Sequence, residues 1–187
     1  PINYGTLKSG TALSFDGVSD RVEVPYDVNL SPETGDYSVS FWVKHDDLDL
    51  SQMYFCQIGT WASDYIRCYM SAGDITVHHK TGNVYRRASV TNTAPIIAGQ
   101  WHCVAVSIDR SVGTSIYVDG VLQTLGTDDG ATEVYDLDFS VSTFIGSRHD
   151  GTSDEIDGLM SGFKFFKGIA IDQDAVRELF LNPEQIL

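Results

Sequence analysis

Aspartates gather in two parts of this 187-residue chain, in a pattern suited to binding calcium. Asp16 and Asp20 flank a short turn, and Asp154 and Asp157 lie in an acidic loop, residues 147–157. Calcium takes six to eight oxygen ligands, among them carboxylates and backbone carbonyls. These four aspartates are therefore the candidate ligands of a calcium cofactor. Two simpler alternatives stay open: Asp16 caps its own turn, and the loop is a solvated acidic rim.

Aromatic and cationic side chains form a second candidate site, because sugars stack their apolar faces on exposed aromatic rings. Trp61 lies at the predicted tip of a hairpin made by residues 53–60 and 64–71, where the fold requires no large ring. The candidate ligand-binding residues are Trp61, Tyr65, Arg67, Tyr69 and Tyr85. The alternative is that Trp61 covers the end of its own domain or contacts a neighbouring subunit.

Equal spacing about Ala62 predicts which side chains of this hairpin share a face, since residues directly opposite each other point the same way. One face is apolar, and we expect it to point inward. Its predicted pairs are Ile58 with Ile66, Cys56 with Cys68, and Tyr54 with Met70. The other face is mixed, and carries Phe55, Gln57, Tyr65, Arg67 and Tyr69.

Other reactive side chains give no recognisable catalytic or zinc-binding arrangement. His78 and His79 are consecutive in a predicted strand, so they point to opposite faces and cannot share a metal. The three cysteines, Cys56, Cys68 and Cys103, have the character of small buried hydrophobic residues. No disulfide framework is implied by an odd and small number of cysteines.

The charge balance narrows the range of partners. The chain carries 26 acidic and 12 basic residues, a formal net charge of −14. Nucleic acids and anionic membranes attract basic surfaces, so neither is an expected partner, and no apolar run is long enough to insert into a membrane. We expect a glycan or a structural protein as partner. No signal peptide precedes the Pro-Ile-Asn start, which suits a virion protein or a domain of a larger extracellular protein.

Short alternating strands dominate the chain. Side chains alternate every second residue along two stretches of residues 101–121, which predicts two strands. They end at Asp119-Gly120, a pair favoured in tight turns. Asp172 caps the one convincing helix, and Asn182-Pro183 ends it. About a dozen short strands with turn signals between them predict an all-β fold. We expect one domain, residues 1–187: a two-sheet antiparallel β-sandwich of the jelly-roll type with a short C-terminal helix.

Several motifs resemble laminin G-like domains of the concanavalin A-like lectin/glucanase jelly-roll group. They occur in the family's order, as ALSFDG (12–17), YSVSFWV (37–43), GQWH (99–102), YVDG (117–120) and the closing strand with its helix. The resemblance implies an adhesive or glycan-binding module, and it places Trp42 and Trp101 in the core. Many members hold calcium. Ser161-Gly162 stands where relatives usually carry an acid in the closing strand, which weakens a calcium site there.

Asp154-Glu155-Ile156-Asp157 is similar to the start of the catalytic strand of laminarinase-type glycoside hydrolases with this fold. Retaining hydrolysis needs two carboxylates about 5–5.5 Å apart. In those enzymes the second acid follows two or three residues after the aspartate, where this chain has Leu159 and Met160. Glycoside hydrolysis is therefore the least favoured function, and we expect no enzyme activity.

The sequence favours a non-catalytic binding or adhesion module that recognises carbohydrate through exposed aromatic and polar residues. The alternative is a structural virion component, a capsid decoration or fibre protein built on a lectin-like fold. A homo-oligomer fits either function.

Overall fold

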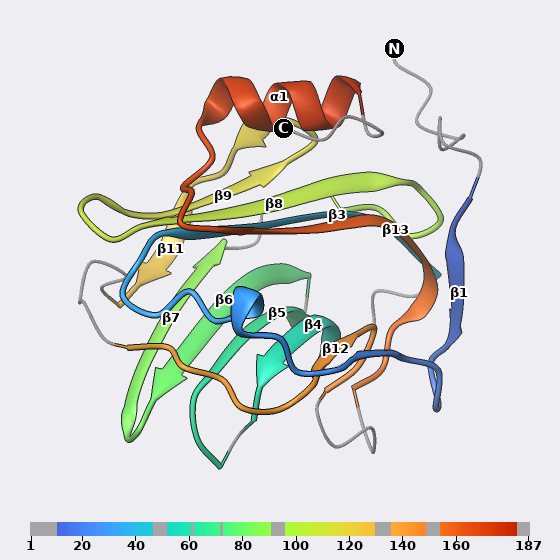
Figure 1. Cartoon of the computed structure of the whole chain (residues 1–187). Helices are drawn as coiled ribbons and strands as arrows, with labels where there is room; N and C mark the ends of the chain where they lie inside the picture. Colours follow the sequence, from blue (N-terminus) through green and yellow to red (C-terminus); the bar gives the residue numbers. More distant parts are fainter. Residues whose placement is uncertain are drawn as a thin grey trace.

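Two antiparallel sheets pack face to face in the computed structural model of the protein (Figure 1). The structure describes residues 11–46, 52–60, 62–71, 73–90, 96–129, 136–148 and 154–182. The six-stranded sheet has the order β1 (Leu13–Asp16), β13 (Asp157–Lys167), β3 (Tyr37–His45), β8 (His102–Asp109), β9 (Gly113–Val118) and β10 (Val121–Leu122). The seven-stranded sheet has the order β11 (Leu125–Asp128), β7 (Val84–Val90), β6 (Asp74–Thr81), β5 (Tyr65–Ser71), β4 (Met53–Gly59), β12 (Thr143–Ile145) and β2 (Val22–Val24). One 3₁₀ turn, η1 (Val28–Leu30), and one helix, α1 (Gln173–Leu181), complete the described elements.

The alternation of β3 explains its place inside the six-stranded sheet. Val39, Phe41 and Val43 point toward the second sheet and are at most 1% exposed. Small Ser38 and Ser40 lie on the other face, which leaves room for the elements that cover it. Strand β3 pairs with β13 on one side and β8 on the other, so the predicted strand pair of residues 101–121 lies within the sheet.

Helix α1 covers the outer face of the six-stranded sheet (Figure 1). The carboxylate of Asp172 accepts the backbone N–H of Ala175 at 2.9 Å, which confirms the predicted N-cap. Phe180 stacks on Trp42 with ring centroids 5.7 Å apart, and Trp101 joins the same cluster. The two tryptophans are therefore buried, as the family resemblance implied.

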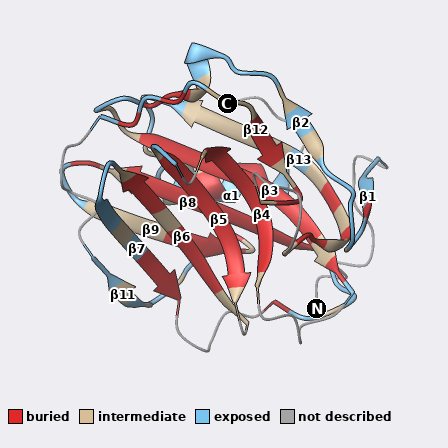
Figure 2. Cartoon of the chain, turned by 90° about the horizontal axis from the view of Figure 1, so that it is seen from below, coloured by how far each residue is buried: buried red, intermediate tan, exposed pale blue. Residues whose placement is uncertain are grey.

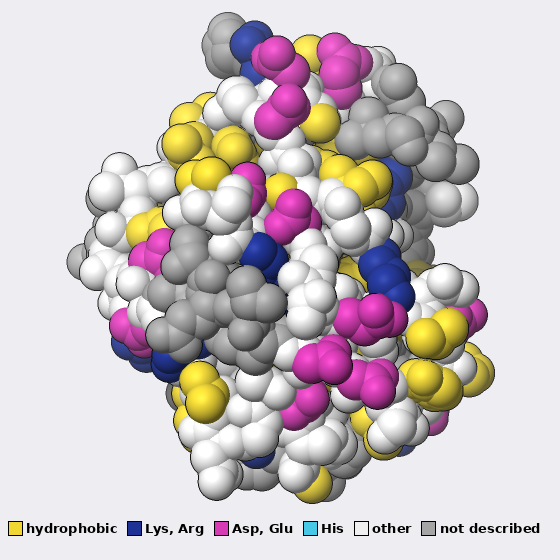
Figure 3. All heavy atoms as spheres, turned by 60° about the vertical axis from the view of Figure 1, so that its left-hand side comes forward, with side chains coloured by type: hydrophobic (Ala, Val, Ile, Leu, Met, Phe, Trp, Pro, Cys, Tyr) yellow, Lys and Arg dark blue, Asp and Glu magenta, His cyan; other side chains and the backbone are white. Residues whose placement is uncertain are grey.

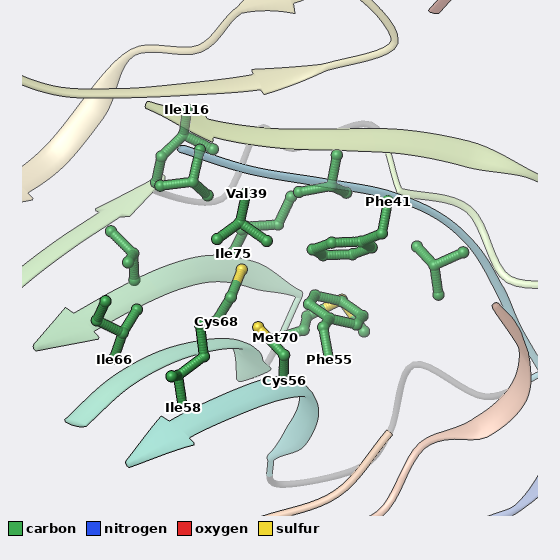
Figure 4. Close-up of a cluster of buried hydrophobic side chains, with 14 of the residues drawn as sticks. Val39, Phe41, Phe55, Cys56, Ile58, Ile66, Cys68, Met70, Ile75 and Ile116 are labelled. Carbon is green, nitrogen blue, oxygen red and sulfur yellow. The ribbon is translucent and has the colours of Figure 1, made fainter. Parts of the chain in front are cut away.

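The main core lies between the two sheets (Figure 4). Phe41 from β3 meets Phe55 from β4 with ring centroids 4.9 Å apart. Cys56 and Cys68 lie directly opposite each other in the register of β4 and β5, and both are buried free thiols. Burial raises the pKa of the Cys56 thiol to about 12, so this sulfur stays protonated and behaves as an apolar group. The same holds for Cys103 on the helix side.

A β-bulge between Tyr54 and Cys56 corrects the predicted register of the β4–β5 hairpin. Cys56 pairs with Cys68 and Ile58 with Ile66, as predicted, but Tyr54 pairs with Tyr69 and not with Met70. Because of the extra residue, the side chains that precede the bulge point to the opposite face of the sheet from the one predicted. Phe55, expected outside, therefore lies in the core, and Tyr54, expected inside, lies on the outer face.

The predicted all-β sandwich with two antiparallel sheets and a short C-terminal helix is confirmed. Asp119 and Gly120, both at positive φ, form the two-residue turn between β9 and β10. Among the described helices, none has the length and apolar character needed to cross a membrane.

Candidate functional site

The outer face of the seven-stranded sheet carries three rows of side chains that run across the strands. Direct register pairing defines each row, because residues opposite one another in antiparallel strands point to the same side. The rows are Tyr54–Tyr69–Thr76–Ser89, then Gln57–Arg67–His78–Arg87, then Gly59–Tyr65–Lys80–Tyr85. Along β5, β6 and β7 the rows are two residues apart, which is about 7 Å, and in β4 the bulge adds one residue between the first two rows. A polar and cationic row therefore lies between two rows that contain tyrosines.

Ring and cation contacts tie the three rows together. The Arg67 guanidinium lies 4.0 Å from the ring centroid of Tyr65 and 5.5 Å from that of Tyr54. Arg67 Nη1 also donates to the Tyr54 hydroxyl at 3.4 Å, and the Tyr54 ring stacks on Tyr69 with centroids 5.1 Å apart. A guanidinium between two tyrosine rings is stabilised by the negative faces of both. These contacts pack the centre of the face.

The second half of the face is built around His78. Its ring meets Tyr65 edge to face, with centroids 5.4 Å apart, and lies 5.8 Å from Tyr85. Lys80 Nζ lies 5.5 Å from the centre of the Tyr85 ring. Burial, together with the positive charges of Arg67 and Arg87, lowers the pKa of His78 to about 4. His78 is therefore a neutral imidazole at pH 7 and can both donate and accept hydrogen bonds.

The first row is buried throughout, whereas exposure increases from β4 to β7 along the second and third rows (Figure 2). Gln57, Tyr65 and Arg67 are buried, whereas Tyr85 is 42% exposed and Arg87 is also exposed. Burial raises the pKa of Tyr65 far above its usual value, so its hydroxyl stays protonated. The accessible part of the face is thus the β6–β7 side, with His78, Tyr85 and Arg87, on a packed base of tyrosine and arginine.

The structure brings four of the five sequence-predicted ligand-binding residues onto this one face. These are Tyr65, Arg67, Tyr69 and Tyr85; Trp61 lies outside the described residues. Sequence reasoning missed Tyr54, His78, Lys80 and Arg87. A signal for the last three was present, since a two-residue Gly82-Asn83 turn between strands 74–81 and 84–90 places Lys80 opposite Tyr85 and His78 opposite Arg87.

Three of the four candidate calcium ligands make other contacts, and the fourth, Asp20, is exposed. The Oδ1 atom of Asp16 accepts the backbone N–H groups of Val18, Ser19 and Asp20 at 2.8–3.0 Å. Those bonds lower the pKa of Asp16 to about 2, and they show that this carboxylate caps its own turn. Asp154 lies 3.6 Å from Arg148 Nη1.

Asp157 faces Asp16 in the register of β13 and β1, and its side chain lies against Gly17. Within the part of the chain that the structure describes, no three His, Cys, Asp or Glu side chains converge to hold a metal ion. Residues 149–153 lie outside the described part, and so does Asp150. The described residues do not fit a calcium site that depends on Asp16.

We expect the melting temperature to be the same, within about 1 °C, in millimolar calcium and in excess EDTA. A calcium ion at 100 times its Kd adds about 2.7 kcal/mol of stability, which raises Tm by roughly 5–10 °C in a protein of this size. Differential scanning fluorimetry with and without calcium measures this directly. A calcium-dependent rise of several degrees would show that the acidic loop holds the ion after all.

The acidic motif at residues 154–157 does not place a second carboxylate beside the first in the described strand. The two residues that stand where hydrolases carry the second acid point to opposite faces. Met160 enters the main core, and Leu159 packs against the cluster of Trp42 and Trp101. Glu155 itself is 5% exposed. The strand therefore uses those two positions for packing.

Comparison with known proteins identifies the family. A laminin G family model, described as the concanavalin A-like lectin/glucanases superfamily, matches residues 16–177. The chain belongs to this superfamily, which confirms the resemblance drawn from its motifs. No curated protein matches the chain in sequence.

Solved structures with the same fold include a pentraxin and bacterial toxin domains. The native heptameric SAP-like pentraxin from Limulus polyphemus has a TM-score of 0.65 and 14% identity, over 89% of this chain and 80% of that one. The receptor-binding domain of botulinum neurotoxin D has a TM-score of 0.69 and 13% identity, over 92% of this chain. This chain spans 43% of that toxin domain. A serotype D ligand-binding domain in complex with N-acetylneuraminic acid has a TM-score of 0.67 and 14% identity, over 88% of this chain and 40% of that one. At these identities the likeness shows the shared fold.

Proposed function

We propose that this protein is a non-catalytic carbohydrate-binding module, and that its ligand docks on the β6–β7 side of the outer face of the seven-stranded sheet. The observation that carries the proposal is the exposed ring of Tyr85, held beside His78 and Lys80 in a face built from stacked tyrosines. Membership of a lectin-containing superfamily supports it, as does a structural neighbour crystallised with a sugar acid.

The chemistry of the accessible residues suits a sugar. The Tyr85 ring offers a flat apolar surface for the C–H face of a pyranose. Neutral His78 can donate and accept hydrogen bonds, and Arg87 offers several N–H donors to ring hydroxyls. Because Tyr54, Tyr65, Arg67 and Tyr69 pack the base of the face, little side-chain freedom is lost when a ligand binds.

We expect Tyr85→Ala to weaken glycan binding at least tenfold, since loss of an aromatic anchor commonly costs about 2 kcal/mol or more. Stability should change by less than about 1 kcal/mol, because the ring is a surface group. The measurement is binding to an immobilised panel of neutral and acidic glycans, followed by calorimetry on those that bind.

Tyr26→Ala is the matched control for this variant. Tyr26 is 48% exposed and follows β2, at the opposite edge of the same sheet, so it loses an equally exposed ring far from the proposed site. The control should bind as the natural protein does. Equal loss in both variants, or unchanged binding in Tyr85→Ala, would contradict the proposed site.

A further inference from the structure

Cationic residues are concentrated on the sheet that carries the proposed site, in a chain that is otherwise acidic. The segment from Tyr65 to Val90, strands β5 to β7, contains four of the 12 basic residues of the chain and one acidic residue, Asp74. Arg67, Lys80 and Arg87 lie on the outer face, whereas Arg86 pairs with His79 on the core side. Acidic side chains recur over the neighbouring face drawn in Figure 3. A cationic area on an acidic protein attracts an anion locally while the rest of the surface repels it.

The register places this charge in the middle of the proposed site. Arg67 and Arg87 lie in the central row on either side of His78, between the two tyrosine-containing rows. After burial, both positive charges lower the pKa of His78, which is consistent with their positions directly beside it in the register. Arg87 is exposed at the end of the row, where its planar group can bind a carboxylate or sulfate through two parallel hydrogen bonds.

Asp129 provides the opposing negative charge. Its backbone N–H donates to the carbonyl of Arg87 at 2.8 Å, and its charge raises the pKa of His78, against the larger effects of burial and the two arginines. Asp64, which lies at the end of β5 nearer the β6–β7 turn, is held by the backbone N–H of Gly82. The central row therefore has two arginines beside His78, with Asp129 as the carboxylate that acts on the same imidazole.

We propose that the ligand of this site is an acidic saccharide, a sugar chain with carboxylate or sulfate groups. One sugar ring stacks on Tyr85 while its anionic group pairs with Arg87, and the charge of Arg67 stabilises the anion from the base of the row. The inference rests on the proposed function and adds the substrate class to it. It also gives Arg87 a role in specificity that Tyr85 does not have.

The test compares each acidic sugar with a neutral derivative of the same backbone. Tetragalacturonic acid is paired with its full methyl ester, and a heparin tetrasaccharide with its desulfated, N-acetylated and carboxyl-reduced form. We expect the acidic member of at least one pair to bind tenfold or more tightly than its neutral partner. Because the attraction is electrostatic, its affinity should fall as salt is raised from about 0.05 M to 0.5 M.

Charge variants locate the effect. Arg87→Gln should weaken binding of the acidic sugar about tenfold, as expected for one lost charge-assisted pair of hydrogen bonds. Asp129→Asn should strengthen that binding severalfold, because the opposing carboxylate is gone. Arg177→Gln is the matched control: it removes the same charge from an exposed position on α1, which covers the other sheet, and should leave binding unchanged.

The outcomes separate this inference from the proposed function. Equal binding of acidic and neutral sugars, lost in Tyr85→Ala, would overturn the acidic class and leave the carbohydrate site in place. Equal competition by inorganic sulfate at the same concentration would mean a simple anion site and would also overturn it. If neither acidic sugar binds, the inference is wrong, and the panel of neutral glycans then decides the proposed function by itself.

Discussion

Gly158→Ala should destabilise the protein by about 4 kcal/mol or more, although it adds a single methyl group. Gly158 lies in β13 between β1 and β3, opposite Phe15 on one side and His45 on the other. A Cβ at this position would lie 2.2 Å from the carbonyl oxygen of Lys44 and 2.7 Å from the Cα of His45, with φ at +140°. Both contacts are with backbone, so the strands themselves would have to separate.

Gly162→Ala is the control in the same strand. Its φ is +61°, so alanine there also adopts an unfavourable backbone conformation, which costs about 1–2 kcal/mol. The atoms nearest to an added Cβ at this position, however, are 3.7 Å away or more. Urea unfolding of both variants measures the difference. If the two variants unfold at the same midpoint, then β13 and β3 do not approach as closely at Gly158 as described.

Acidification from pH 7 to pH 4.5 should remove about 2–3 kcal/mol of unfolding free energy through His79 alone. His79 is 3% exposed in the core side of β6, and its Nδ1 lies 3.0 Å from the hydroxyl of Tyr37. Burial, aided by the charge of Arg110, lowers its pKa from 6.5 to about 3. His79 is therefore protonated below about pH 6.5 in the unfolded chain, but only below about pH 3 in the folded protein. The stability is complete above pH 6.5 and is lost as the pH falls toward 3.

His79→Gln tests this account, because glutamine can keep a hydrogen bond to Tyr37 but does not titrate. Urea unfolding at a series of pH values gives the slope of the unfolding free energy against pH. Between pH 6 and pH 4 this slope should be smaller in the variant than in the natural protein by about 1.4 kcal/mol per pH unit. An unchanged slope would assign the acid sensitivity to other groups. A lower stability of His79→Gln at pH 7 would not affect the test, because the test compares only how the unfolding free energy changes with pH.

Local patterns in the sequence were enough to predict much of this fold. The alternation of residues 37–43, the Asp119-Gly120 turn and the Asp172 cap each depend on side chains within a few positions, and the structure has all three as predicted. The covering of the six-stranded sheet by α1 was not predicted. That contact joins residues 42 and 180, and no local period encodes it.

The candidate site was predictable only in part, for a reason that a single residue shows. Tyr54 was assigned to the core because a symmetrical hairpin has no extra residue, and one bulge moved its ring to the outer face. There it contacts Tyr69 and Arg67, and so completes the base of the site. The cationic row depends on the register of four strands at once, so its members become neighbours only when the sheet is assembled.

Amide chemical-shift mapping by NMR, with the tightest-binding sugar of the panel, tests the central claim most directly. The account predicts saturable shifts that centre on His78, Tyr85 and Arg87 in β6 and β7, and that disappear in Tyr85→Ala. Shifts that centre instead on α1 and β10, on the face of the other sheet, would contradict it, because the sugar would then bind where the cationic row and its tyrosines are absent.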